Sequence, residues 1–172
     1  MQPIVDFFDH PFFIVLGGIS TLVTLIAIAF AVYLFIKGIF PVWLRLGMGL
    51  SRRKIAVFAE KEFDGLKSML VDSGVFHKAN VIKINKGAIK KAEEITLFLV
   101  HWKCFEAEID DILRMKKDST ALIVYAPQSE GFIDQASLGK INQERNSIVV
   151  NLRGRLLNDV LLSMITTGYK GK

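Results

Sequence analysis

Basic and aromatic side chains lie at the ends of three apolar, strand-like runs of this sequence. They are Lys86, Trp102, Lys103, Arg153 and Arg155. Arginine and lysine pair with phosphate oxygens, and nucleobases stack on aromatic rings. In open α/β sheets, ligands bind beyond the carboxyl ends of the strands. We therefore expect these residues to bind an anionic nucleotide. The alternative is that they are ordinary polar loop residues in a lysine-rich chain.

The segment Asn151-Leu-Arg-Gly-Arg155 is the most unusual of these loops. Gly154 allows the backbone to approach a ligand closely, and the N–H groups at the start of a following helix attract anions. The chain contains no G-x-G-x-x-G and no G-x-x-x-x-G-K-[ST] pattern. The sequence therefore argues against a Rossmann dehydrogenase and against a P-loop NTPase.

A carboxylate after the third run offers a catalytic alternative. Glu106 follows Trp102 by four residues, and there it could act on a bound sugar or nucleotide. The structural alternative is that Glu106 and Glu108 begin a helix, where acidic residues interact favourably with the helix dipole. Cys104 would then be a small buried hydrophobic residue. We favour a protein that is not an enzyme, with Glu106 as the alternative catalytic residue.

The chain has one cysteine, Cys104, and three scattered histidines, His10, His77 and His101. A single cysteine forms no intrachain disulfide and suits a reducing compartment. The spacing of these four residues matches no metal-binding motif. We predict no metal site and no resident cofactor.

The elements that must position these residues alternate along residues 54–172. Short runs rich in β-branched and aromatic residues predict strands at 54–59, 80–85, 95–102, 121–126 and 147–151. Helical patterns follow them at 63–71, 88–94, 105–116, 134–143 and 156–165. Apolar strands separated by helices are typical of a parallel sheet covered on both faces. We predict an α/β fold, a five-stranded, flavodoxin-like doubly wound domain with strand order 2-1-3-4-5.

The N-terminal part of the chain is apolar enough to lie in a membrane. Phe12 to Ile36 is a run of 25 residues without a charge, and about 20 helical residues are enough to cross the hydrocarbon core. A cleaved signal peptide would have a shorter apolar core with basic residues before it, whereas Asp6 and Asp9 precede this one. We expect a transmembrane helix at 12–36.

Basic residues lie only on the C-terminal side of this segment. None of the 22 lysines and arginines precedes it. The positive-inside rule then predicts a single-pass protein of the cell (inner) membrane with its N-terminus outside. The expected parts are a short extracytoplasmic tail (1–11), the transmembrane helix (12–36), a basic juxtamembrane segment (37–53) and a cytosolic domain (54–172). The basic surface favours anionic lipid headgroups, nucleotides or nucleic acid, although we expect no DNA or RNA polymer as partner.

Small and hydroxylated residues recur along the apolar segment with a heptad spacing. The seam consists of Gly17, Ser20, Thr24, Ala27, Ala31, Leu34 and Gly38. Small residues let transmembrane backbones pack closely, and hydroxyls can bond across the interface. Small residues are also frequent in single anchors. We favour a homo-oligomer that associates along this seam, which could also line a narrow polar path.

A membrane span joined by a basic segment to a small Rossmann-like domain resembles prokaryotic antiviral membrane effectors. It is most similar to CRISPR-associated membrane proteins that bind cyclic oligoadenylate through a cytosolic domain. The resemblance is architectural, covers the whole chain and rests on no diagnostic motif. It implies an oligomer in which a nucleotide second messenger, held by Lys86, Trp102, Lys103 and Arg153, moves the transmembrane helices and breaches the membrane. This non-enzymatic sensor is the leading hypothesis.

A second resemblance is to TIR domains. Residues 54–59, KIAVFA, are similar to their first strand, and Trp102 with Glu106 resembles the tryptophan–glutamate pair after their third strand. The family has a Ser-rich loop after the first strand, where this chain has AEKEF, and a longer loop before the glutamate. The likeness implies a TIR-like fold, with a membrane-tethered NAD glycohydrolase using Glu106 as the enzymatic alternative. A third possibility is a membrane adaptor that docks a partner protein.

Overall fold

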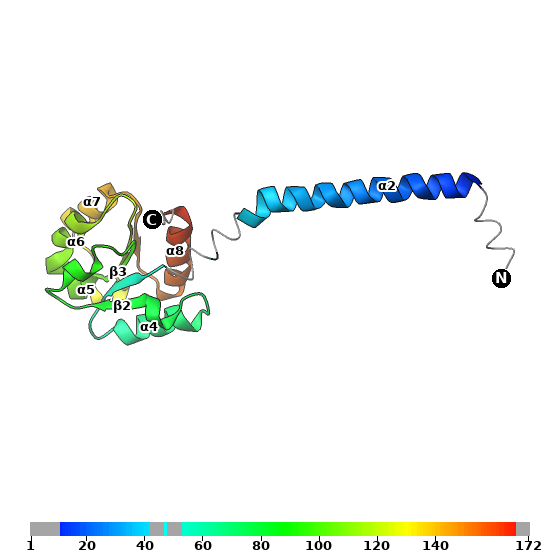
Figure 1. The fold of residues 1–172 in the computed structure, drawn as a ribbon. Helices are drawn as coiled ribbons and strands as arrows, with labels where there is room; N and C mark the ends of the chain where they lie inside the picture. Colours follow the sequence, from blue (N-terminus) through cyan, green and yellow to red (C-terminus); the bar gives the residue numbers. More distant parts are fainter. Residues whose placement is uncertain (1–10, 42–46, 48–52, 168–172) are drawn as a thin grey trace. The chain divides into compact units, whose positions relative to one another are not determined.

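The computed structural model describes residues 11–41, 47 and 53–167 (Figure 1). The chain divides into two units, Met1–Arg45 and Leu46–Lys172, which we treat separately. Nearly all of the expected extracytoplasmic tail and most of the basic juxtamembrane segment lie outside the described residues. The same holds for the last five residues of the chain.

The first unit contains one long apolar helix. α2 (Pro11–Leu34) continues into a π-helical segment, η1 (Phe35–Ile39). The stretch Val15–Ile39 has a mean hydropathy of 2.5 and is long and apolar enough to cross a membrane. Two of its hydroxyls are bonded within the helix, since the Oγ1 atoms of Thr21 and Thr24 donate to carbonyls four residues back, each at 2.8 Å. The segment therefore needs no outside partner for these groups.

The π-helical segment changes the course of the predicted seam. Its members from Gly17 to Leu34 lie on the regular α-helix, whereas Gly38 lies in η1. A π-helix places more residues in each turn than an α-helix, so a spacing of three and four no longer follows one face there. The seam that a partner helix could use therefore ends before Gly38. Self-association stays a prediction.

The second unit is built on a sheet of five parallel strands. The strands are β1 (Ile55–Phe58), β2 (Val81–Ile84), β3 (Leu97–His101), β4 (Ala121–Tyr125) and β5 (Ser147–Val150). They are ordered β2-β1-β3-β4-β5, which confirms the predicted order. β1, β3 and β4 are buried along their whole length. That burial explains why these strands read as continuous apolar runs rather than as alternating patterns.

One face of the sheet packs against two helices, α4 (Phe63–Asp72) and α8 (Arg153–Thr166) (Figure 1). Alternate strand residues such as Val57, Leu99 and Ile123 form a buried cluster with Leu66 of α4 and Val160 of α8. We call this the α4/α8 face. Because successive strand residues point to opposite faces, the residues between them belong to the other side.

The other face packs against α6 (Ile109–Met115) and α7 (Gln135–Gln143), and we call it the α6/α7 face. Its cluster includes Phe58, Phe98 and Phe105, whose rings meet edge to face at 5.3 and 5.6 Å between centroids. α7 begins at a good cap, since the carboxylate of Asp134 accepts a bond from the N–H of Ser137 at 2.9 Å. Hydrogen bonds from the side chain and then the backbone of Ser137 lower the pKa of Asp134.

Two predicted helices differ in the structure. Residues 88–94 contain only a 3₁₀ turn, η3 (Ile89–Ala92), in which Ala92 alone is buried, so no apolar stripe supports a longer helix. The helix expected at 105–116 is broken into α5 (Trp102–Phe105), the 3₁₀ turn η4 (Glu106–Glu108) and α6. The burial of Trp102 and Phe105 gives α5 its own packing, and the backbone leaves the helical conformation at Phe105. α8 begins three residues earlier than predicted.

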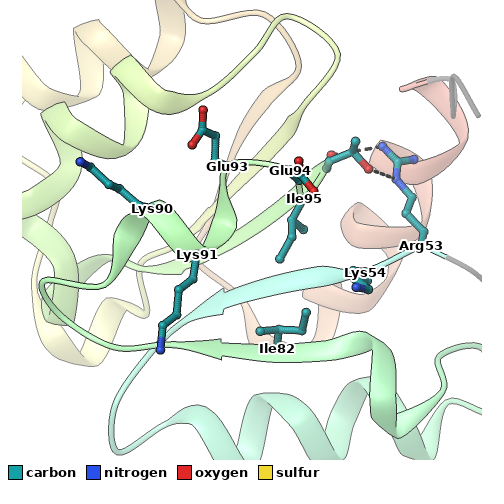
Figure 2. Close-up of a pocket in the computed structure, with 9 residues that line it drawn as sticks. Arg53, Lys54, Ile82, Lys90, Lys91, Glu93, Glu94 and Ile95 are labelled. Atoms are coloured by element: carbon teal, nitrogen blue, oxygen red, sulfur yellow. Dashed lines mark hydrogen bonds between the residues drawn. The ribbon is translucent and has the colours of Figure 1, made fainter. Parts of the chain in front are cut away.

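A single buried arginine holds the amino edge of the sheet together. Arg53 is 3% exposed, and its guanidinium donates to the side chain and carbonyl of Thr96 at 2.9 and 3.2 Å (Figure 2). It also donates to the carbonyls of Met164 and Thr167 at 2.7 and 2.9 Å, and to the Thr167 hydroxyl at 2.6 Å. These carbonyls belong to the C-terminal end of α8, where helix carbonyls lack intrahelical partners and carry partial negative charge.

Arg53 therefore joins the start of β1, the approach to β3 and the end of α8. Sequence analysis assigned it to the basic juxtamembrane segment, but its contacts are those of the α/β unit. Burial lowers the pKa of Arg53. Within the described part of the chain it forms no ion pair, so neutral oxygens alone satisfy its charge.

We predict that Arg53→Ala lowers the free energy of unfolding by about 3 kcal/mol, because several buried acceptors lose their donor. The measurement is denaturant unfolding of the full chain in detergent, followed by tryptophan fluorescence. Lys54→Ala, a neighbouring change at an exposed position, should stay within about 0.5 kcal/mol of the wild type. Equal stability of Arg53→Ala and Lys54→Ala would contradict the structural role of Arg53.

Candidate functional site at the carboxyl edge of the sheet

The end of β3 carries a buried imidazole without hydrogen bonds. His101 is 1% exposed, and neither of its ring nitrogens has a hydrogen-bond partner among the described residues. Its Nε2 lies 3.5 Å from Oε2 of Glu130, close enough for an ion pair if the imidazole is protonated, but without hydrogen-bond geometry. Buried polar groups in proteins are nearly always bonded, so those that are not often mark functional sites.

A phenol lies beside this imidazole. Tyr125 ends β4 in register with His101, and the two rings meet edge to face with centroids 5.7 Å apart. Burial raises the pKa of Tyr125. The charge of Arg153 acts in the opposite direction, whereas the carboxylates of Glu62 and Glu130 raise this pKa further. Arg153, Glu62 and Glu130 therefore all lie close enough to the phenol to act on its pKa.

An arginine–glutamate pair lies at the start of two helices. Nη1 of Arg153, the first residue of α8, is 3.7 Å from Oε2 of Glu62, which precedes α4. Their side chains are 50% and 40% exposed, and an ion pair this exposed stabilises a protein only weakly. Arg153 can therefore exchange Glu62 for another anion at little cost. We call Glu62, His101, Tyr125, Glu130 and Arg153 the edge cluster.

Gly65 allows the arginine to lie against α4. A Cβ atom at Gly65 would be 2.8 Å from Nη2 of Arg153, which is closer than real contacts allow. The guanidinium thus occupies the space that a side chain at position 65 would fill. Because Gly65 lies in the first turn of α4, Arg153 is held where the unbonded N–H groups of the helix begin. Arginine and helix N-termini both bind phosphate oxygens.

Only one of the five predicted ligand-binding residues belongs to the edge cluster, namely Arg153. Trp102 is 3% exposed and packs in the α6/α7 face, so its ring has no open surface for stacking. Lys103 is exposed and pairs with Glu106 at 3.5 Å. Lys86 and Arg155 are exposed, and across the described residues no ion pair joins them to the cluster.

The alternative catalytic residue, Glu106, makes no described ion pair with the edge cluster. Glu106 is 50% exposed in the turn η4, and its described ion pair is with Lys103. Among the residues that the structure describes, no group of three histidine, cysteine or acidic side chains could hold a metal ion. A catalytic role for Glu106 stays a prediction that no contact in the structure favours.

Sequence reasoning missed four members of the edge cluster: Glu62, His101, Tyr125 and Glu130. A signal for two of them was present, because His101 and Tyr125 end neighbouring buried strands and pairing in register places them side by side. Glu62 and Glu130 lie in loops, whose course the periodicity of a sequence does not predict.

A cavity of about 610 Å³ at the amino edge is less suited to an anion (Figure 2). Its lining contains Arg53, whose guanidinium is already fully bonded within the protein. Lys90 and Lys91 also line it, but Figure 2 shows their side chains pointing in different directions. Glu93 and Glu94 add negative charge to the same lining. The basic groups here do not converge on one point.

Comparisons with known proteins identify no relative. No protein-family model matches the chain, and searches of curated proteins and of solved structures found no match. Any functional conclusion therefore depends on the site itself.

We predict that Arg153→Gln raises the pKa of Tyr125 further, because the variant removes the positive charge that lowers it and leaves Glu62 without its partner. An alkaline titration of the full chain, followed by phenolate absorbance, measures this pKa, with Tyr125→Phe identifying the signal of that residue. Arg155→Gln removes a neighbouring charge of the same sign and should have no effect. An unchanged Tyr125 midpoint in Arg153→Gln would show that the cluster is not coupled as described.

Proposed function

We propose that this chain is a membrane-anchored receptor whose α/β unit binds an anionic nucleotide at the edge cluster. The observation that carries the proposal is the position of Arg153. It lies against Gly65 at the start of α4, and its charge acts on the phenol of Tyr125, which pairs in register with His101. His101 ends β3 beside this phenol, but its side chain is buried and therefore does not itself face a ligand.

The topology of the sheet supports the same location. We propose that the unit is doubly wound in the flavodoxin-like manner, since helices pack on both faces and the order is β2-β1-β3-β4-β5. In such sheets ligands bind where the strand order reverses, which here lies between β1 and β3. The chain leaves β1 toward Glu62, and β3 ends at His101, so the edge cluster borders this point.

α8 offers a physical route from the ligand to the membrane anchor. It begins at Arg153 in the edge cluster and ends at carbonyls that Arg53 binds, about 21 Å away for 14 residues. Arg53 lies two residues before the start of β1, on the side of the chain that leads to the apolar helix. A ligand that shifts Arg153 therefore acts on the helix to whose C-terminal end Arg53 is bonded.

On the membrane side we propose that the N-terminus is outside a cell (inner) membrane and that copies associate along α2. The charge asymmetry around the span supports the orientation. A nucleotide second messenger shared between copies would perturb or permeabilise the bilayer. It can shift the equilibrium between a resting state and a membrane-perturbing state only by the difference in its affinity for the two. An antiviral role rests on the architectural resemblance alone.

The test of ligand binding is the thermal stability of the full chain with a panel of cyclic nucleotides. A ligand at 100 times its Kd should stabilise the fold by about 2.7 kcal/mol. We predict that Gly65→Ala weakens binding about ten-fold or more, because its Cβ displaces the Arg153 guanidinium. Alanine is the better helix former by about 1 kcal/mol, so the fold should not suffer.

Gly139→Ala is the matched control, because Gly139 is also helical but a Cβ there meets nothing within 4 Å. It should gain the same helix propensity and bind as the wild type does. If no member of the panel stabilises the wild-type chain, or if both glycine variants bind equally, the proposed site is wrong.

We predict that Gly17→Val weakens self-association of the full chain in lipid vesicles, because the seam loses the close approach that glycine permits. Energy transfer between labelled copies measures the association. Gly18→Val places the same side chain one residue away, off the seam, and should leave the transfer unchanged. Equal transfer in the two variants would remove the seam from the proposal.

A further inference from the structure

A small cavity lies beyond the ends of β4 and β5, on the side of the sheet that packs against α7. Its volume is about 120 Å³, and Ala126, Leu138 and Val149 supply apolar lining. Gln128 and Asn151 supply two amides, and neither makes a hydrogen bond to another described side chain or to backbone. The cavity therefore combines apolar walls with donors and acceptors that are available to a ligand.

An exposed aromatic ring completes this lining. Phe132 lines the cavity and yet is 86% exposed, more than any other large hydrophobic side chain in the described residues. The residue before it, Gly131, has φ 101° and ψ −177°, a conformation that is essentially restricted to glycine. The glycine conformation at Gly131 therefore directly precedes the exposed ring of Phe132.

We propose that this cavity is a nucleobase subsite, in which Phe132 stacks on the base and the two amides bond its edge. Aromatic rings stack on any base, and Asn and Gln amides match the donors and acceptors of base edges. This inference rests on the proposed function, since it assigns the base of the same nucleotide whose phosphate binds Arg153.

The chain itself joins the two subsites. Asn151 in the cavity and Arg153 in the edge cluster are separated by one residue, so their Cα atoms are at most about 7 Å apart. Glu130, which approaches His101, precedes Phe132 by two residues. The loop after β4 thus supplies Gln128 and Phe132 to the cavity and Glu130 to the charged cluster.

The experiment is calorimetric titration of the full chain in detergent with the four ribonucleoside monophosphates and with ribose 5-phosphate. The wild type should bind at least one mononucleotide more tightly than ribose 5-phosphate. Phe132→Ala should remove this difference, about ten-fold or more, and leave the binding of ribose 5-phosphate unchanged. Phe132→Trp should preserve the preference, because it keeps a stacking ring.

Two further variants separate local from general effects. Leu162→Ala truncates a hydrophobic side chain on α8 that is 55% exposed and should change nothing. Gly131→Ala strains the loop that holds Phe132 and should weaken mononucleotides selectively.

If mononucleotides and ribose 5-phosphate bind equally well to the wild type, or if Phe132→Ala leaves the preference intact, the base subsite is wrong while the anion site stands. Absence of binding by every probe would overturn both proposals.

Discussion

All five strands of the sheet run in the same direction, and the positions of the polar groups follow from this constraint. Each helix that follows a strand begins at the carboxyl edge, so the positive ends of α4 and α8, which cover the same face, lie at one edge. Pairing in register then sets the last residues of β3 and β4, His101 and Tyr125, side by side at that edge. Antiparallel pairing of either strand would have sent one of these groups to the opposite end of the sheet.

The two edges differ in how far their polar groups are satisfied. At the amino edge, the guanidinium of Arg53 makes five hydrogen bonds to residues of the same unit. At the carboxyl edge, His101 is equally buried but its ring nitrogens are unbonded, and Arg153 has only an exposed partner. The cost of burying an unbonded imidazole is tolerated most readily at a functional site. The amino edge thus fixes the fold and the carboxyl edge is the part suited to binding.

Periodicity predicted the strands and most of the helices, because burial on both faces leaves continuous apolar runs that few other structures produce, and the strand order followed from the fold class that these elements indicated. It also selected Arg153, through the unusual loop after the last strand. It misplaced Trp102, since an aromatic residue just after a strand can turn either toward the core or toward solvent, and here the short helix α5 turns it inward. Phe132 and Glu130 were missed because they lie in a loop whose conformation depends on one glycine with a positive φ, Gly131.

Hydrogen exchange of the full chain, compared with and without a bound cyclic nucleotide, tests the central claim most directly. A phosphate held by Arg153 would accept bonds from the N–H groups in the first turns of α4 and α8. We expect slower exchange in peptides that cover residues 62–66 and 153–156, together with the C-terminal turn of α8 if the helix transmits the change. Protection confined to the segments around Lys86 and Lys103 would place the ligand elsewhere and contradict the assignment of the edge cluster.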